Sequence, residues 1–177
     1  MQYISHYESP IGKMLISADD IGLTGLWFEE QKYFGAGLGP VKEEKEVPSL
    51  IQTREWLDIY FSGEKPGFDP PLHLIGTEFQ QEVWKILRDI PYGCTTTYGE
   101  IAKQIAGAHG LKRMSAQAVG GAVGHNKISI IVPCHRVTGA DGSLTGYAGG
   151  MDRKSFLLKL ENAYRKEFYI PKASKAP

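Results

Sequence analysis

The sequence has few of the features that mark secreted, membrane or metal-binding proteins. Its 177 residues include only two cysteines, Cys94 and Cys134, with no Cys-x-x-Cys spacing, and its five histidines are scattered. No stretch approaches the roughly 18 apolar residues that a membrane span needs, and residues 1–6 contain neither a basic leader nor an apolar core. We therefore expect a cytoplasmic protein with reduced thiols, no membrane segment and no metal site.

A formal net charge of zero hides a strong segregation of charge along the chain. Residues 1–100 carry 8 Lys and Arg against 16 Asp and Glu, a balance of −8, whereas residues 101–166 carry 10 against 3, a balance of +7. A polyanion responds to such a local field even when the whole molecule is neutral. The charges could instead only solvate two faces, but that alternative does not explain why they segregate by segment.

The first half of the chain predicts a small sheet with a covering helix. Aromatic and β-branched residues are interrupted by turn residues, which is typical of a meander of short strands. Residues 31–47 then form a solvated connector, and apolar residues recur at helical spacing from Ser49, the expected N-cap, to Gly63. The predicted strands are residues 3–7, 13–17 and 23–28.

The second half of the chain predicts helices. Thr77 and Gln80 fit a Thr-x-x-Gln capping box for a helix that Pro91 ends. Two short helices separated by a glycine-bearing break then outline a helix-turn-helix unit, and Asp152 is the expected cap of a last helix. The two short helices are residues 98–106 and 115–123.

Residues 64–76, rich in proline, glycine and charge, are the best candidate for a linker between two units. We therefore expect an N-terminal domain at residues 1–75, a C-terminal domain at 76–166 and a tail at 167–177, of which residues 170–177 are expected to be poorly ordered.

The helix at residues 115–123 has almost no side-chain bulk on one side. Glycine lowers helix stability, so a glycine pair here suggests that something must approach the backbone closely. One explanation is tight packing against another helix, and the other is entry into a DNA minor groove only ~6 Å wide. Composition alone does not choose between them. The small residues are Ala116, Ala118, Gly120, Gly121 and Ala122.

Residues 130–137, Ile-Ile-Val-Pro-Cys-His-Arg-Val, predict a buried strand that ends at a reachable thiol. Pro133 ends the strand, which places Cys134 at a bend. A free thiol with a pKa near ~8.5 needs a base or a positive charge to react as thiolate, and His135 and Arg136 are the nearest candidates. Alone, such a Cys-His pair would more often be a packing feature than a reactive one.

The surrounding residues closely resemble the O6-alkylguanine-DNA alkyltransferase family. That family combines a Pro-Cys-His-Arg-Val core with an asparagine eight residues before the cysteine, here Asn126, and with Gly-Tyr-x-Gly-Gly beyond it, here residues 146–150. The match is dense from Gly76 onward and loose before it. The resemblance implies a fold of class α/β plus α: an N-terminal ribonuclease H-like β-sheet with a covering helix, and a C-terminal winged-helix-like helix-turn-helix domain.

The resemblance also implies which residues carry the chemistry. Cys134 would accept the alkyl group, His135 would take the thiol proton through a bridging water, and Glu161 would orient the imidazole. Tyr98 would give a proton or hydrogen bond to the ring nitrogen beside the leaving oxygen.

Other matched positions would bind the extruded base and the DNA. The carbonyl of Val137 would accept from the exocyclic amine, the amide of Ala148 would reach O6, and Asn126 would brace the turn before the cysteine. Tyr147 and Gly149 would shape the wall beside the alkyl group. The expected DNA contacts are Arg113, Ala116, Gln117, Ala118, Gly120 and Gly121.

The implied function is direct reversal of DNA damage. The protein would act as a monomer on double-stranded DNA containing O6-alkylguanine, with acceptance of O4-alkylthymine left open. It would need no cofactor because the lesion supplies the alkyl group, and it would turn over once because a thioether has no reasonable leaving group. The main alternative is a non-catalytic binder that recruits other repair proteins; a cysteine hydrolase and a transcription regulator are further ones.

Two positions depart from the family pattern. Lys127 follows Asn126 where proline is common, which we expect to loosen the turn without affecting the chemistry. Gln117 stands where the family often has an arginine that fills the gap left by the flipped base. Its amide can hydrogen-bond the orphaned cytosine, but it lacks the charge and reach of arginine, so base flipping should be weaker.

We predict that Gln117→Arg repairs duplex DNA faster than the unsubstituted protein, because arginine would fill the vacated space more completely. Single-turnover rates on the same duplex measure this difference. Equal rates for the two proteins would contradict the expectation.

Overall fold

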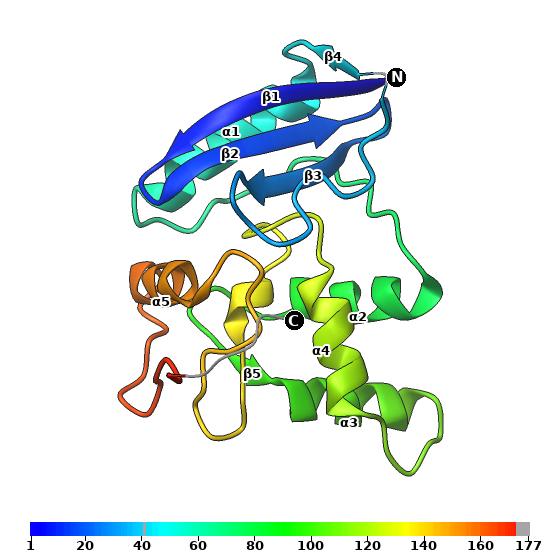
Figure 1. Ribbon diagram of the computed structural model, residues 1–177, viewed down its shortest axis with the longest axis vertical. Coiled ribbons are helices and arrows are strands. Elements are labelled where there is room, and N and C mark those ends of the chain that lie inside the picture. Colours follow the sequence, from blue (N-terminus) through cyan, green and yellow to red (C-terminus); the bar gives the residue numbers. More distant parts are fainter. Residues whose placement is uncertain (41, 173–177) are drawn as a thin grey trace. The chain divides into compact units, whose positions relative to one another are not determined.

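The computed structural model describes residues 1–40 and 42–172 (Figure 1). The chain forms two units, one of Met1–Ile75 with Lys127–Ile131 and one of Gly76–Asn126 with Val132–Pro177. The sequence predicted one passage between domains, after residue 75. In the structure the chain also returns to the first unit for five residues, immediately before the segment that carries Cys134.

The first unit is built on a four-stranded sheet in the order β3-β2-β1-β4. Strands β1 (Gln2–Ser9), β2 (Gly12–Ala18) and β3 (Leu23–Phe28) pair antiparallel, which confirms the predicted meander. Strand β4 (Lys42–Glu44) adds to β1 in parallel, so part of the stretch predicted as a solvated connector, residues 31–47, is exposed as expected but forms a strand that was not predicted. The three residues of β4 are charged and exposed, so the apolar alternation that would predict a strand is missing. Charged residues are nevertheless common on edge strands.

Helix α1 (Pro48–Phe61) lies against one face of this sheet, as expected (Figure 1). Its buried side includes Leu50 and Leu57, while Trp56 and Tyr60 stack with ring centroids 5.2 Å apart. Ser49 is not the N-cap. The cap is Val47, which makes no side-chain cap bond; Pro48 at the first helical position has the helical φ, and the amide that it lacks would have had no partner inside the helix.

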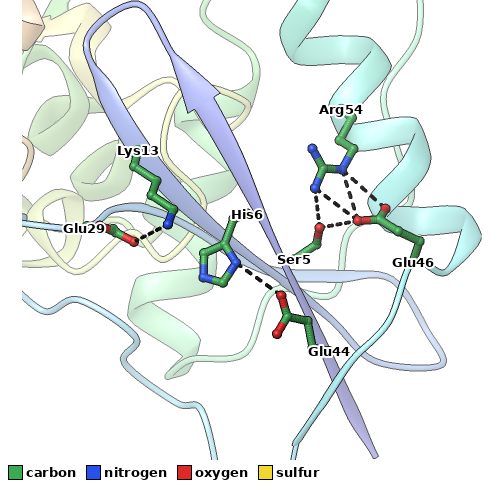
Figure 2. Close-up of polar contacts among 7 residues, drawn as sticks. All are labelled: Ser5, His6, Lys13, Glu29, Glu44, Glu46 and Arg54. Carbon is green, nitrogen blue, oxygen red and sulfur yellow. Dashed lines mark hydrogen bonds and ion pairs between the residues drawn. The ribbon is translucent and has the colours of Figure 1, made fainter.

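Polar contacts at the sheet edge attach α1 to β1 (Figure 2). Arg54 of α1 donates to the carboxylate of Glu46 at 3.1 Å and to the hydroxyl of Ser5, and that hydroxyl also donates to Glu46. Burial would raise the pKa of Glu46, but its bonds to Ser5 and Arg54 hold it below the ordinary value. Two more exposed pairs in the same view, His6 with Glu44 and Lys13 with Glu29, contribute little because solvent screens them.

The returning segment Lys127–Ile131 pairs with the outer strand of this sheet. The amide of Leu26 donates to the carbonyl of Lys127 at 2.8 Å, and the amide of Ser129 donates to the carbonyl of Leu26 at 3.0 Å. The ammonium of Lys127 donates to the carbonyl of Ile75 at 2.9 Å. Lys127 was expected to loosen the turn, but these contacts hold it instead through both its backbone and its side chain.

The second unit contains helices α2 (Glu78–Arg88), α3 (Tyr98–Ala108), α4 (Ala116–Gly124) and α5 (Met151–Leu160). The predicted capping box is present, because the Thr77 hydroxyl accepts from the amide of Gln80 and the Gln80 side chain accepts from the amide of Thr77. Buried Trp84 of α2 donates its indole N–H to the carbonyl of Ala122 in α4 at 2.9 Å. This bond fixes the approach of the two helices.

Two details of this unit differ from the predictions. Helix α5 starts after Gly150, whose φ is +93°, so Asp152 lies in the first turn and is not the cap. The predicted tail begins with ordered residues: Phe168 is buried in a cluster with Leu144, and Tyr169 donates to the carboxylate of Asp141 at 2.6 Å. Residues 173–177, most of the stretch expected to be poorly ordered, lie outside the described residues.

A short parallel pair completes the second unit, between β5 (Thr96–Thr97) and β6 (Val137–Thr138). This pair joins the start of α3 to the residues directly after the Cys-His-Arg sequence. None of the helices in the described part of the chain is long and apolar enough to span a bilayer.

Candidate active site

Cys134 lies at the start of a single 3₁₀ turn, η1 (Cys134–Arg136). Residues 130–132 are buried, as expected, but they do not form the predicted strand. Ile130 has φ of 70°, and the amides of Ile131 and Cys134 each bond the carbonyl two residues earlier, at 2.8 Å. Because these amides are satisfied locally, no ladder to a neighbouring strand forms. The thiol is therefore positioned by consecutive tight turns.

Cys134 is 6% exposed, and among the described residues one side-chain hydrogen-bond donor lies beside its sulfur. The side-chain amide of Asn126 donates to Sγ at 3.2 Å and to the carbonyl of Val132 at 2.8 Å. Burial raises the pKa of Cys134, against the bond from Asn126 and the charge of Lys154, which lower it. The predicted bracing role of Asn126 thus coincides with direct contact to the sulfur.

His135, Arg136 and Glu161 form a buried hydrogen-bonded cluster, and His135 directly follows Cys134 in the chain. Nε2 of His135 lies 2.5 Å from one oxygen of Glu161, and Nε of Arg136 donates to the other oxygen at 2.8 Å. Arg136 also donates to the carbonyl of Ile90 at 2.8 Å, and the amide of Gly93 donates to Glu161 at 3.3 Å. Burial would raise the pKa of Glu161, but its bonds to His135 and Arg136 hold it well below the usual range.

The cluster sets the protonation state of the imidazole. Burial lowers the pKa of His135, against the opposing effect of Glu161, so the ring is neutral at neutral pH. Because an ionised carboxylate can only accept, Nε2 carries the ring proton and Nδ1 keeps a lone pair. Nδ1 is buried and has no hydrogen-bond partner among residues 1–40 and 42–172. A neutral imidazole with one nitrogen paired and one available has the arrangement of a general base.

Tyr98, the first residue of α3, points its hydroxyl to the loop before α5. The hydroxyl donates to the carbonyl of Thr145 at 3.0 Å, and burial, together with nearby Cys134, raises its pKa. Gly146, which follows Thr145 in the chain, has φ of +93°, and a Cβ there would lie 2.1 Å from the phenolic oxygen of Tyr98. Glycine at this position is therefore required for the tyrosine to reach its place.

Lys154 also belongs to this site, and no role was predicted for it from the sequence. It is fully buried on α5, and its ammonium donates to the carbonyls of Val137 and Thr145, the latter at 3.0 Å. The same nitrogen lies 5.8 Å from the ring centroid of Tyr98. The sequence signal was present: a lysine stands three and four positions before Leu157 and Leu158, on the buried side of the helix.

The residues predicted to line the base pocket lie around the same centre, with different exposure. Tyr147 is buried and its ring is edge-on to that of His135, with centroids 6.4 Å apart. Gly149 is buried and Ala148 is half-buried. The carbonyl of Val137, expected to meet the guanine amine, accepts from Lys154 here and has a second lone pair for another donor.

The predicted DNA-contact residues lie on α4 and in the loop before it. Arg113 and the first residues of the helix are exposed, while Gly120 and Gly121 are half-buried. A Cβ at Gly120 would make only an ordinary contact, 3.9 Å from Tyr98, and one at Gly121 would meet nothing within 4 Å. Packing inside the protein therefore does not require these glycines, which favours an outside partner close to the backbone. The exposed helix residues are Ala116, Gln117 and Ala118.

Within the described ranges, no three His, Cys, Asp or Glu side chains are grouped so that they could hold a metal ion.

Family models match both halves of the chain. Residues 78–163 match the DNA binding domain of 6-O-methylguanine DNA methyltransferase, and residues 2–74 match its ribonuclease-like domain. The chain belongs to this family. Both parts of the predicted fold, the ribonuclease-like sheet unit and the helical DNA-binding unit, are thereby confirmed.

Individual family members are similar over most of their length. A methylated-DNA–protein-cysteine methyltransferase of Mycolicibacterium paratuberculosis is 48% identical over 89% of this chain and 90% of its own. One from Methanosarcina acetivorans is 47% identical over 91% and 99%. The crystal structure of Mycobacterium tuberculosis OGT in complex with DNA has a TM-score of 0.77 and 44% identity, covering 91% of this chain and 93% of that one.

We predict that Glu161→Gln makes this methyltransferase-family protein less stable and less sensitive to acid. Removing one member of a buried ion pair lowers the free energy of unfolding by about 3 kcal/mol. The native pKa of Glu161 lies below its ordinary 4.5, so its contribution is complete above that pH and is lost as the pH falls further. Because the pKa of His135 is also lowered, the stability of the folded protein falls as the pH drops below about 6.5. Urea unfolding between pH 7 and pH 3 measures both effects.

Glu167→Gln is the matched control, because Glu167 is exposed. It should change stability at pH 7 by no more than about 0.5 kcal/mol and keep the original pH dependence. A Glu161→Gln protein that lost stability below pH 4.5 as steeply as the unsubstituted protein would contradict the prediction.

Proposed function

We propose that this protein repairs duplex DNA by transferring the alkyl group of O6-alkylguanine to Sγ of Cys134, once per molecule. The observation that carries the proposal is a buried thiol followed directly in the chain by a buried, neutral imidazole whose Nε2 is paired with a carboxylate. This arrangement lies in the part of the chain that matches a DNA-binding domain of the 6-O-methylguanine methyltransferases.

In the chemical step, the thiol proton moves to Nδ1 of His135 through a bridging water, and the imidazolium is stabilised by Glu161. A sulfur lone pair attacks the alkyl carbon while the bond from that carbon to O6 breaks. The electron pair passes into the guanine ring, where a nitrogen takes a proton from Tyr98, and the proton held by His135 is then returned to the phenolate. Guanine then leaves neutral, and Cys134 is left as a thioether.

The target base has to leave the duplex before a buried thiol can reach it, which requires a few kcal/mol and less for a damaged pair. The bare exposed face of α4 supports a minor-groove approach, and Arg113 precedes it. Gln117 would occupy the space of the extruded base. The protein would act as a monomer in the cytoplasm, where Cys134 stays reduced.

The proposal predicts that a slight excess of duplex DNA with one O6-methylguanine adds one methylene mass to the protein. Intact-protein and peptide mass spectrometry should place the addition on the Cys134 peptide and show saturation at one per molecule. Transfer should disappear in Cys134→Ser and persist in Cys94→Ser, since Cys94 is the other free cysteine and is exposed.

Binding of the modified duplex with no mass gain would overturn the proposal in favour of a non-catalytic binder. Repeated turnover with no lasting adduct would also overturn it, because it would indicate a hydrolase.

A further inference from the structure

Lys154 is a fully buried lysine with no carboxylate partner in the described residues. An ammonium removed from water without a counter-charge is unfavourable, so such a residue needs a physical reason to be retained. Its donors reach two backbone carbonyls, those of Val137 and Thr145. Two neutral dipoles orient the ammonium but do not balance its charge.

Among the described residues, the titratable groups that act on Lys154 or lie beside it are Cys134, His135 and Tyr98. His135 is already paired with Glu161, and Tyr98 is held neutral by burial. Cys134 is the remaining group that can become negative. Burial lowers the pKa of Lys154 to about 7, while charge on Cys134 acts to raise it, and Lys154 in turn acts to lower the pKa of the thiol.

We propose that Lys154 is a positioning residue for the transfer: its ammonium group is the counter-charge of the Cys134 thiolate and is held in place by the carbonyls of Val137 and Thr145. The consequence for the transfer rests on the proposed function, but the ion pair itself is a property of the protein without DNA.

The pairing accounts for the charges that arise when the thiol ionises. The proton leaves Sγ for Nδ1 of His135, so one negative and one positive charge appear inside the protein. The new imidazolium faces the carboxylate of Glu161, and the new thiolate faces the ammonium of Lys154. Each buried charge then has a partner of opposite sign, which lowers the energy of the ionised state in a region of low dielectric.

Lys154 also connects the thiol to the phenol. The carbonyl of Thr145 accepts from both Lys154 and Tyr98, and Gly146 leaves room for the phenol. Loss of the lysine would therefore disturb geometry as well as charge. An experiment has to separate these two effects.

Three substitutions separate them: Lys154→Met keeps volume without charge or donor, Lys154→Gln keeps a donor without charge, and Lys154→Arg keeps the charge. The ionisation of Cys134 is followed without DNA by the ultraviolet absorbance of the thiolate as a function of pH, with Cys134→Ser in each background as the blank. Lys159→Met is the control, because Lys159 lies on the same helix but is exposed.

We expect the Met and Gln variants to raise the pKa of Cys134 by about 1–2 units, and the Arg and Lys159→Met variants to leave it within about half a unit. Single-turnover transfer by the Met and Gln variants should fall roughly 10-fold or more at pH 7 and recover as the pH rises past the new thiol pKa. Such recovery with pH would not accompany a purely structural defect.

An unchanged thiol titration in the Met and Gln variants, or a loss of transfer equal at every pH, would overturn the proposal. If those two variants do not fold, Lys154→Arg decides alone: a thiol pKa at or below that of the unsubstituted protein supports the ion pair, and one raised by a unit overturns it. Failure of the proposed function would look different, because the unsubstituted protein would then show the thiol titration without any transfer.

Discussion

The buried carboxylate of Glu161 is the group on which the second unit depends. Isolated in the interior, it would be unfavourable by several kcal/mol, so the surrounding chain has to supply donors. Arg136, His135 and the amide of Gly93 do so, and Arg136 extends the network to the carbonyl of Ile90, two residues after α2. The contacts that keep the carboxylate ionised also orient the imidazole of His135, the residue after Cys134, so stability and chemistry share one set of contacts.

Burial shifts the pKa of the thiol and the pKa values of the two basic groups of this site in opposite directions. The balance of these shifts decides how the thiol can react. Burial raises the pKa of Cys134 and lowers those of His135 and Lys154, which keeps all three uncharged more often than they would be in water. A protonated, enclosed thiol is protected from adventitious oxidation and alkylation. Activation then depends on moving one proton between groups that are already in place, and a thioether formed there stays enclosed.

Local rules predicted much of the fold, and they failed where distant parts of the chain decide. The meander, the Thr77 capping box and the helices on either side of the break follow from turn residues and periodicity. The strand Lys42–Glu44 and the turns at residues 130–132 do not, because a neighbouring edge determines the first and i to i+2 bonds determine the second. In the site, the Cys-His pair could be recognised from the motif. The position of Lys154 next to the site, in contrast, follows only from the packing of α5 against η1.

Burial keeps the imidazole of His135 neutral, and the carboxylate of Glu161 fixes its proton on Nε2, which leaves the lone pair on Nδ1. Long-range ¹H–¹⁵N NMR of the histidine rings, recorded without DNA from pH 5 to pH 8 and assigned with a His135→Gln variant, reports the protonation of each ring nitrogen. The account predicts the Nε2–H tautomer of His135 at neutral pH and its persistence below pH 6.5. An imidazolium or an Nδ1–H tautomer at pH 7 would contradict it.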